Sequence, residues 1–339
     1  FLMAVLRHSL DPRANRAYLT EFAMELWHEI LKNTASLSQD LTNLFAVWPH
    51  HVTTGIDIMM ASLPVVNSYI LLATPDFLNK HGDLLKNALC RLFADVRDEG
   101  RVMVVKNIEH LAERLPCQFT KVMQPMLSTI IKALLDSANG ERKNGRRTSS
   151  SSSSSLSNVS SDKTLRVYSR LLTRLLFQDT KGITDLIGKQ VAGSTEKVIQ
   201  VLGTIIGIWL DRLGDSWELY KRRVAALAML KCLMDIPSDR LVLAHLAAVL
   251  AYCGGVVAEE AAGETKNYIP DFSAVKQIPE NQRIESHRKL ILISNDPALK
   301  IRVKAATIEA LKKISNRLGQ QKFGQLWNSI DKLIKAPFS

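Results

Sequence analysis

The sequence predicts an all-α protein, an α-solenoid (superhelix) built from HEAT-like antiparallel helix pairs. Apolar residues recur at spacings of three and four along most of the 339 residues, which places them on one face of successive helices. Short turns with capping residues, glycine or proline separate about fourteen such segments, and the implied repeat is close to the length of a HEAT unit. Alternating apolar runs are rare, and a hydrophobic content of 46% is ample for a packed core.

The first long helix is predicted over residues 13–33, "RANRAYLTEFAMELWHEILKN". Several of its apolar residues follow the spacing of a single helical face. We expect that face to be the buried one, and its members are Tyr18, Leu19, Phe22, Leu26 and Ile30.

Capping signals position the helices that follow. Ser38 is placed to cap one helix, and Thr74 followed by Pro75 is a strong start signal for another. Pro64 lies inside an apolar segment, where it removes one intrahelical hydrogen bond and should kink or split the helix. The helices expected in this part are residues 13–33, 37–48, 50–73, 74–96, 101–115 and 118–136.

Composition changes abruptly in a serine-rich segment, residues 139–162, which contains seven consecutive serines starting at Ser149. Almost nothing in it is apolar, so it cannot bury enough surface to offset the entropy of ordering, and we expect a disordered loop. Arg146-Arg147-Thr148-Ser149 has the R-R-x-S form that basic-directed kinases read. Ser149 is therefore a candidate phosphosite.

The stretch "GTIIGIWLDRLGDSWELYKRRVAALAMLKCLM", residues 203–234, predicts two helices with one break at Gly214-Asp215-Ser216. We expect the turn to bring charged residues together as the elbow of a helical hairpin, because HEAT arrays often set an Asp in one turn against an Arg or Lys in the next. The same cations could instead bind a phosphate or an acidic partner. The charged residues are Asp211, Arg212 and the candidate partner-binding residues Lys221, Arg222 and Arg223.

The C-terminal part is expected to contain a long acidic and proline-containing loop, residues 254–282, before a basic helical hairpin, residues 283–339. Asp296 should cap that hairpin, Pro297 should open it, and Gly319 should end its first helix. Candidate partner-binding residues here are Arg302 and Lys304. We therefore expect HEAT-like repeats over residues 1–138 and 163–253. The serine-rich loop (139–162) separates them, and the acidic loop (254–282) and the basic hairpin (283–339) follow.

Charge is concentrated at the C-terminal end. The net charge is +11, and the last 57 residues carry 12 basic and 4 acidic side chains. Such an end could meet an acidic protein, nucleic acid or a membrane surface, and charge alone does not choose among them. The five tryptophans do not interleave with basic residues, so nucleic acid is a minor candidate. No stretch approaches the roughly 20 uncharged apolar residues of a membrane span, so no membrane partner is expected.

Motifs for catalysis, cofactors and metals are missing from the sequence. It has no P-loop, dinucleotide-binding, GxSxG or HExxH motif, and its four cysteines lack the paired spacing of a zinc site. We therefore expect no enzyme activity, no cofactor and no metal, with the cysteines as reduced and mostly buried thiols. His50-His51 is expected to be a solvated turn, and His28 and His245 are expected to be packing residues. The chain, starting at Phe1 within an amphipathic segment, is expected to be a fragment.

Three runs carry a family resemblance. "VVNSYILLATPDFL" (65–78), "IIGIWLDRLGDSWELYKRRVAALAML" (205–230) and "SNDPALKIRVKAATIEALKKISNRLGQQKFGQLWNSID" (294–331) resemble the C-terminal half of a receptor of the importin-β (karyopherin-β) family. The resemblance covers nearly the whole chain at scattered positions, and the polyserine tract departs from it.

This resemblance implies a nuclear import receptor without a catalytic step. Such a receptor binds protein cargo on its solenoid, meets FG nucleoporins in the pore, and releases cargo when the GTPase Ran binds in its GTP form. The family's main Ran site lies in N-terminal repeats that this chain lacks. The resemblance also implies a monomer that shuttles between cytoplasm and nucleus. An exportin-type receptor, or a general HEAT scaffold such as a phosphatase regulatory subunit without Ran dependence, remain alternatives.

Overall fold

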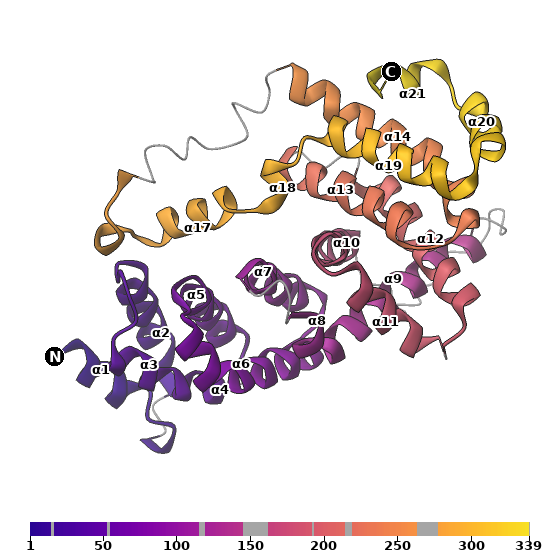
Figure 1. The fold of residues 1–339 in the computed structure, drawn as a ribbon. Helices are drawn as coiled ribbons and strands as arrows, with labels where there is room; N and C mark the ends of the chain where they lie inside the picture. The colour runs from indigo at the N-terminus through magenta and orange to yellow at the C-terminus, as the bar shows by residue number, and fades with distance from the viewer. Residues whose placement is uncertain are drawn as a thin grey trace. The chain divides into compact units, whose positions relative to one another are not determined.

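The computed structural model confirms the all-α prediction for the residues that it describes (Figure 1). These are residues 1–14, 17–52, 55–114, 119–144, 162–191, 193–213, 219–262 and 277–338. The chain divides into two compact units: unit 1 is Phe1–Leu115 with Asp271–Asn295, and unit 2 is Pro116–Pro270 with Asp296–Ser339.

In unit 1, α2 (Ala17–Lys32) packs against α5 (Ile56–Leu72), and α5 packs against α7 (Asp98–Arg114). A helix from late in the chain, α17 (Glu285–Ser294), also packs against α5. The other helices of this unit are α1 (Leu2–Ser9), α3 (Gln39–Leu44), α4 (Trp48–His51) and α6 (Pro75–Asp95), with short 3-10 turns at Pro12–Ala14, Phe45–Val47 and Glu280–Gln282.

Aromatic side chains make up the centre of unit 1. Phe45 lies between Trp48 and Tyr69, with ring centroids 5.7 and 4.7 Å away, and Phe77 stacks on Tyr69 at 5.4 Å. All four are buried, and each large ring contributes on the order of 2–3 kcal/mol by leaving water. This cluster packs the 3-10 turn Phe45–Val47 together with α4, α5 and α6.

Local capping predictions hold in unit 1. The Ser38 side chain accepts a hydrogen bond from the Leu41 amide at 3.3 Å, and the Thr74 side chain accepts one from the Phe77 amide at 3.2 Å. Pro64 lies inside α5 as expected, but the helix continues through it and is not split.

The predicted buried face of α2 is wrong. Tyr18 and Phe22 are 74% and 67% exposed, whereas the buried side chains are Thr20, Ala23, Met24, Trp27 and Leu31. Apolar residues occur around much of α2, so their spacing alone does not determine which face is buried. The buried face is the one that carries Trp27, which contacts Tyr69 of α5.

Unit 2 is arranged around α13 (Leu219–Asp235), which packs against α10 (Asp162–Gln178), α14 (Asp239–Ala261) and α19 (Val303–Leu318). Most of its side chains are buried, as expected for a helix enclosed by neighbours. The remaining helices are α8 (Phe119–Val122), α9 (Gln124–Asn144), α11 (Thr180–Gln190), α12 (Thr195–Leu213), α18 (Pro297–Lys300), α20 (Gln320–Ser329) and α21 (Lys332–Lys335).

Two predicted loop boundaries need correction. The loop predicted from Gly254 is wrong for its first part, because α14 continues through Gly254-Gly255 to Ala261 and buries Val256. Residues 263–276 of that prediction lie outside the described residues. The serine-rich loop predicted from residue 139 is wrong for residues 139–144, which belong to α9. The remainder of that expected loop, up to residue 161, lies outside the described residues.

Contrary to our expectation from the sequence, α14 is long and apolar enough to cross a membrane by length and composition. In the structure its side chains Leu246, Val249 and Leu250 are fully buried, and the helix packs against α13 and α19. One face of α14 therefore belongs to the core of unit 2.

Residues 283–339 do not form a single hairpin as expected. Their first part, α17, belongs to unit 1, and the chain enters unit 2 at Asp296. The predicted cap holds, since Asp296 Oδ1 accepts a hydrogen bond from the Ala298 amide at 2.7 Å and Pro297 opens α18. Gly319 ends α19 with a φ of 79°, a left-handed conformation that favours glycine.

Cationic side chains repeatedly cap the carboxyl ends of neighbouring helices. Lys231 on α13 donates to the Phe177 carbonyl at the end of α10, at 2.9 Å. In the same way, Arg317 on α19 donates to the Leu233 carbonyl near the end of α13, also at 2.9 Å. Each bond satisfies a carbonyl that has no partner within its own helix and complements the helix dipole. This recurrence supports the repeated helix-pair architecture.

Candidate partner-binding surface

Arg222 and Arg223, predicted as partner-binding residues, hold elements of unit 2 together. Arg222 Nη1 lies 2.5 Å from Glu259 Oε1, and Arg223 Nε lies 3.2 Å from Glu260 Oε1. Arg223 also donates to the Ile301 carbonyl from both Nε and Nη2, at 3.1 and 2.5 Å. The two guanidinium groups therefore link α13 to the end of α14 and to the end of α18, and little of either faces solvent.

The carboxylates of these pairs lie where an acidic loop was expected. Glu259 and Glu260 belong to the last turn of α14, and Glu264 lies outside the described residues. Burial raises the pKa of the Glu260 carboxyl, and the neighbouring Arg223 opposes that rise. The geometry assigns these two acids to internal pairing.

The charged residues around the α12–α13 turn do not form a single corner. Arg212 pairs with Asp162 at the start of α10, whereas Arg222 and Arg223 reach α14. Lys221 is half-buried. The helix break predicted at Gly214-Asp215-Ser216 lies outside the described residues, between the end of α12 and the start of α13. The expected gathering of charges is wrong, because Arg212 contacts α10 whereas Arg222 and Arg223 both contact the end of α14.

The Asp-to-cation tie expected between repeats occurs elsewhere. Asp296 is buried and pairs with Arg174 of α10, while its Oδ2 accepts a hydrogen bond from the Tyr220 hydroxyl. Arg174 also donates to the Tyr220 hydroxyl. The sequence reasoning missed Arg174 and Tyr220, whose separation from Asp296 along the chain leaves no local signal.

Arg302 and Lys304, in contrast, are exposed at the start of α19. We refer to these two and to three other exposed cations of the segment 300–332 jointly as the C-terminal basic surface. None of the five lies within 4 Å of a carboxylate in the part of the chain that the structure describes, whereas nearby Lys313 pairs with Glu309 at 2.8 Å. The members of the surface are Lys300, Arg302, Lys304, Lys312 and Lys332.

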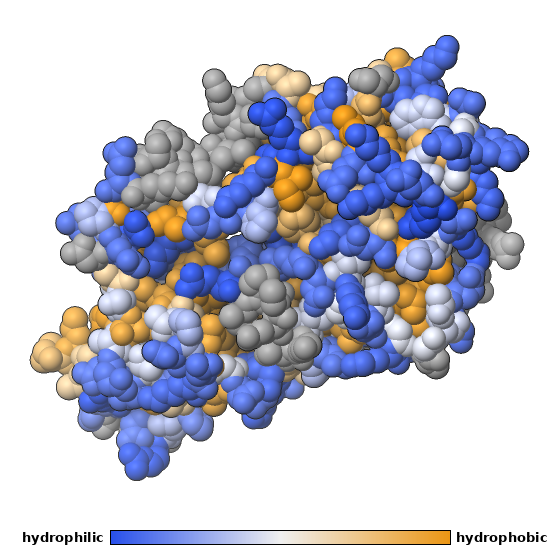
Figure 2. All heavy atoms as spheres, in the orientation of Figure 1, coloured by the Kyte–Doolittle hydropathy of each residue, from blue (hydrophilic) through white to orange (hydrophobic). Residues whose placement is uncertain are grey.

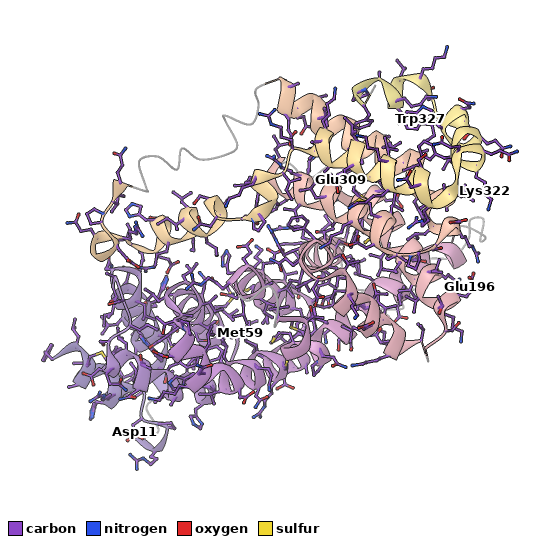
Figure 3. All side chains as sticks on the ribbon, viewed as in Figure 1. Asp11, Met59, Glu196, Glu309, Lys322 and Trp327 are labelled. Atoms are coloured by element: carbon purple, nitrogen blue, oxygen red, sulfur yellow. The ribbon has the colours of Figure 1, made fainter. Side chains whose placement is uncertain are left out.

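The face of α19 to α21 seen in Figure 2 is largely hydrophilic, in line with these cations. Figure 3 shows Glu309 on α19 and Lys322 and Trp327 on α20. Trp327 stacks on Phe323, with ring centroids 5.9 Å apart, and Lys335 Nζ lies 5.5 Å from its ring centroid. The Trp327 and Phe323 rings therefore contact each other and Lys335 within unit 2.

Two histidine predictions are corrected. His51 is buried rather than solvated, and its Nε2 donates to the Leu10 carbonyl at 3.0 Å. His28 has a carboxylate neighbour that spacing did not reveal, since its Nε2 lies 3.4 Å from Glu285 Oε2 on α17. Among the described residues, no three His, Cys, Asp or Glu side chains lie close enough to hold a metal ion.

The cysteines in the described ranges are free thiols. Cys232 and Cys253 are fully buried, and burial raises the pKa of each thiol to about 12. Cys90 is half-buried, and Cys117 lies outside the described residues. The candidate phosphosite Ser149 also lies outside the described residues.

The fold defines a class of protein: an all-helical protein in which successive helices pack as antiparallel pairs. The family model described as "Importin-11-like, TPR repeats" matches residues 1–339, and the chain belongs to this family. TPR and HEAT units are both antiparallel helix pairs, so the description agrees with the predicted architecture.

The relatives are distant but aligned over nearly the whole chain. Human Importin-11 is 23% identical over 98% of this chain and mouse Importin-11 is 22% identical over the same share. The chain spans 33% of each of these proteins. A solved structure of an engineered protein covers 100% of this chain and 87% of its own, at 14% identity and a TM-score of 0.42.

Proposed function

We propose that the chain is a partner-binding part of a nuclear import receptor, which binds protein cargo on its helical repeats and releases it under the control of RanGTP. Membership of the Importin-11-like family supports this proposal. So does an architecture of stacked helix pairs, which exposes a long surface without needing a catalytic centre.

The observation that carries the proposal furthest is the C-terminal basic surface. Its five exposed cations have no carboxylate within 4 Å among the described residues. Arg302 acts at longer range on Glu260, whose pKa it lowers, so the charges most available to an incoming acidic protein are those of the four lysines. Unpaired surface charge accelerates encounter with a partner of opposite sign and selects against partners of like sign. An acidic face of a cargo, or of Ran, is the kind of partner that this surface fits.

The wider partners follow from the family. In this proposal the parent protein contacts FG nucleoporins, binds Ran, and shuttles between cytoplasm and nucleus. The chain acts as a monomer, and neither nucleic acid nor a membrane is a partner.

A capture experiment with the parent protein tests this function. The protein would be immobilised in cell extract containing Ran locked in its GTP or its GDP form, and bound proteins would be identified by mass spectrometry. An import receptor loses a set of bound proteins when RanGTP is present. An exportin would gain them, and a scaffold of the phosphatase-regulatory kind would show no dependence on Ran, so either result would contradict the proposal.

A further inference from the structure

An open groove in unit 1 is the largest feature of that unit that the contacts described so far do not use. It is enclosed by the end of α4, the start of α5 and the turn from α6 to α7, and its volume is about 540 Å³. All of these elements belong to unit 1. Apolar side chains make up most of the lining, and they are Val52, Ile56, Met59, Leu92 and Val96.

Two glycines leave room for this groove. Gly55 precedes α5 in an extended backbone conformation, and a Cβ there would meet no described atom within 4 Å. Gly100, in the first turn of α7, is buried, and a Cβ on it would lie only 2.8 Å from Val96 Cβ. Val96 therefore lies directly on the backbone of α7, while the space beside Gly55 stays open.

The groove has a buried floor and an exposed apolar edge. Met59, labelled in Figure 3, and Leu92 are each 2% exposed, whereas Ile56 is 68% exposed. Met60, which follows on α5, is 47% exposed. Isolated apolar residues on a surface are ordinary, but an exposed isoleucine that continues into an apolar groove with polar residues around it is typical of an interaction site.

Carboxylates outnumber cations at the rim. Asp95, Arg97 and Glu99 line the groove and are exposed. Asp95 lies 3.7 Å from Arg91 on its own helix, an exposed pair that contributes little. Neither Glu99 nor Asp57, which is exposed in the first turn of α5, has a cation within 4 Å in the ranges that the structure describes. The rim therefore offers negative charge to a partner.

From this arrangement we propose that the α5–α7 groove, as we call it, binds a short segment of a partner protein that carries two bulky apolar side chains and a single lysine or arginine next to them. The apolar side chains replace water against Ile56, Met59 and Val96. The cation meets the carboxylates of Asp95 and Glu99. The volume is within the range of roughly 300–1,000 Å³ that is usual for ligand sites with an apolar lining and a few polar groups.

Apolar lining and rim charge together select this partner. An acidic segment would set like charges against the rim and lose affinity. A run of cations without apolar side chains would leave the apolar lining in water, and an uncharged apolar segment would gain nothing from the carboxylates. The groove contains no residue of the C-terminal basic surface, so the two surfaces take partners of different chemistry.

Selection from a random peptide library, with the full chain as the target, tests the groove. Peptides displayed on phage would be selected on wild type and counter-selected on Ile56→Ser, a change at an exposed side chain that should leave the fold intact. We expect the enriched peptides to share two bulky apolar residues and one neighbouring lysine or arginine. Acidic peptides, lysine-rich peptides without apolar residues, uncharged peptides, or no peptide that depends on Ile56 would each overturn the proposal.

Affinities measured with an enriched peptide then locate the contact. In fluorescence anisotropy, Ile56→Ser should weaken binding about tenfold or more, because it removes an apolar contact at the edge of the groove. Gly55→Leu, which adds a side chain where the groove is open, should weaken binding as well. The matched control is Leu243→Ser, at a leucine of α14 that is 54% exposed, which should bind the peptide as wild type does. Wild-type affinity for both groove variants would refute the site.

A double-mutant cycle isolates the contribution of the rim. Glu99→Gln should weaken binding of the charged peptide about threefold or more, and should not affect a peptide whose lysine or arginine is replaced by glutamine. Glu21→Gln, at another exposed acid of unit 1, should leave both affinities unchanged. An equal effect of Glu99→Gln on the two peptides would overturn the proposed pairing. Thermal unfolding of each variant checks the fold, and Ile56→Ser and Gly55→Leu test the groove independently of each other.

Discussion

Trp27 of α2 donates a hydrogen bond from Nε1 to the hydroxyl of Tyr69 on α5, at 3.1 Å, and the two rings meet edge to face with centroids 5.7 Å apart. The Tyr69 hydroxyl in turn donates to the Leu41 carbonyl at 2.6 Å. Both aromatic side chains are fully buried. A single hydroxyl therefore joins three parts of unit 1 in a water-free setting.

Replacing Tyr69 with Phe should destabilise the protein by about 1–3 kcal/mol, because a buried indole N–H and a buried carbonyl both lose their partner. Urea unfolding, followed by tryptophan fluorescence, measures the change. The matched control is Tyr18→Phe, at a residue that is 74% exposed, where stability should stay within about 0.5 kcal/mol of wild type. Equal effects at the two positions would show that the Tyr69 hydroxyl is not a structural link.

Arg317 provides a second test of the repeat architecture. It donates to the carbonyls of Leu233, Met234 and Ile236, of which only that of Ile236 also accepts a backbone hydrogen bond, from the Ser238 amide. Arg317→Ala should therefore leave the Leu233 and Met234 carbonyls without this donor and cost about 2–3 kcal/mol. Lys312→Ala, on the exposed side of the same helix, should change stability by less than about 0.5 kcal/mol. Thermal or urea unfolding of the two variants compares them, and an Arg317→Ala protein as stable as wild type would contradict the capping role.

The pH dependence of stability should show the contribution of Glu285. Although burial alone would raise its pKa, the neighbouring His28 ring, the Lys289 ammonium and the hydrogen bond from Ser68 lower the pKa of this carboxyl well below its ordinary value of 4.5. A carboxyl whose pKa is lowered on folding stabilises the protein above its unfolded-state pKa and loses that contribution as the pH falls through the folded-state value. Wild type should therefore exceed Glu285→Gln in stability at neutral pH.

Urea unfolding of wild type and Glu285→Gln, from neutral pH down to about pH 3, follows this difference. We expect the difference between the two proteins to narrow as the pH falls below 4.5. A difference that grows with acidification would have the wrong sign for a carboxylate that is held ionised by its partners.

Thiol reactivity should separate the cysteines by burial. Cys232 and Cys253 are fully buried with a pKa of about 12, so they hold almost no thiolate at mildly alkaline pH and should resist a maleimide reagent in the folded protein. Of the three cysteines in the described ranges, Cys90, which is half-buried, should react first. Mass spectrometry of peptides after timed labelling reads this order, and rapid labelling of Cys232 or Cys253 under native conditions would oppose the described burial.

Local signals were sufficient to predict many helix ends, and long-range contacts explain most of what the sequence reasoning missed. Ser38, Thr74, Asp296 and Gly319 act as predicted because a cap involves only residues within one turn. The continuation of α14 past Gly254 was missed because two adjacent glycines normally disfavour a helix. Packing against α13 and α19 outweighs that preference.

Partner choice among charged residues was not predictable from spacing. Ser68 and Glu285 are 217 residues apart, and Arg223 and the Ile301 carbonyl are 78 apart, so no local pattern connects them. In consequence, Arg222 and Arg223 were grouped with Arg302 as partner-binding candidates although the first two are internally paired. In the folded chain, Arg222 and Arg223 are paired with carboxylates and mostly buried, whereas Arg302 is exposed.

The central claim is that the C-terminal basic surface binds acidic proteins, and charge reversal tests it most directly. Arg302→Glu/Lys304→Glu would be compared with Lys32→Glu/Lys86→Glu, which makes the same change in net charge at paired lysines of unit 1. Quantitative mass spectrometry of proteins captured from extract would follow binding for each parent protein. We predict about a tenfold loss of captured acidic proteins for the first variant and little change for the second. Equal capture by both variants would contradict the claim.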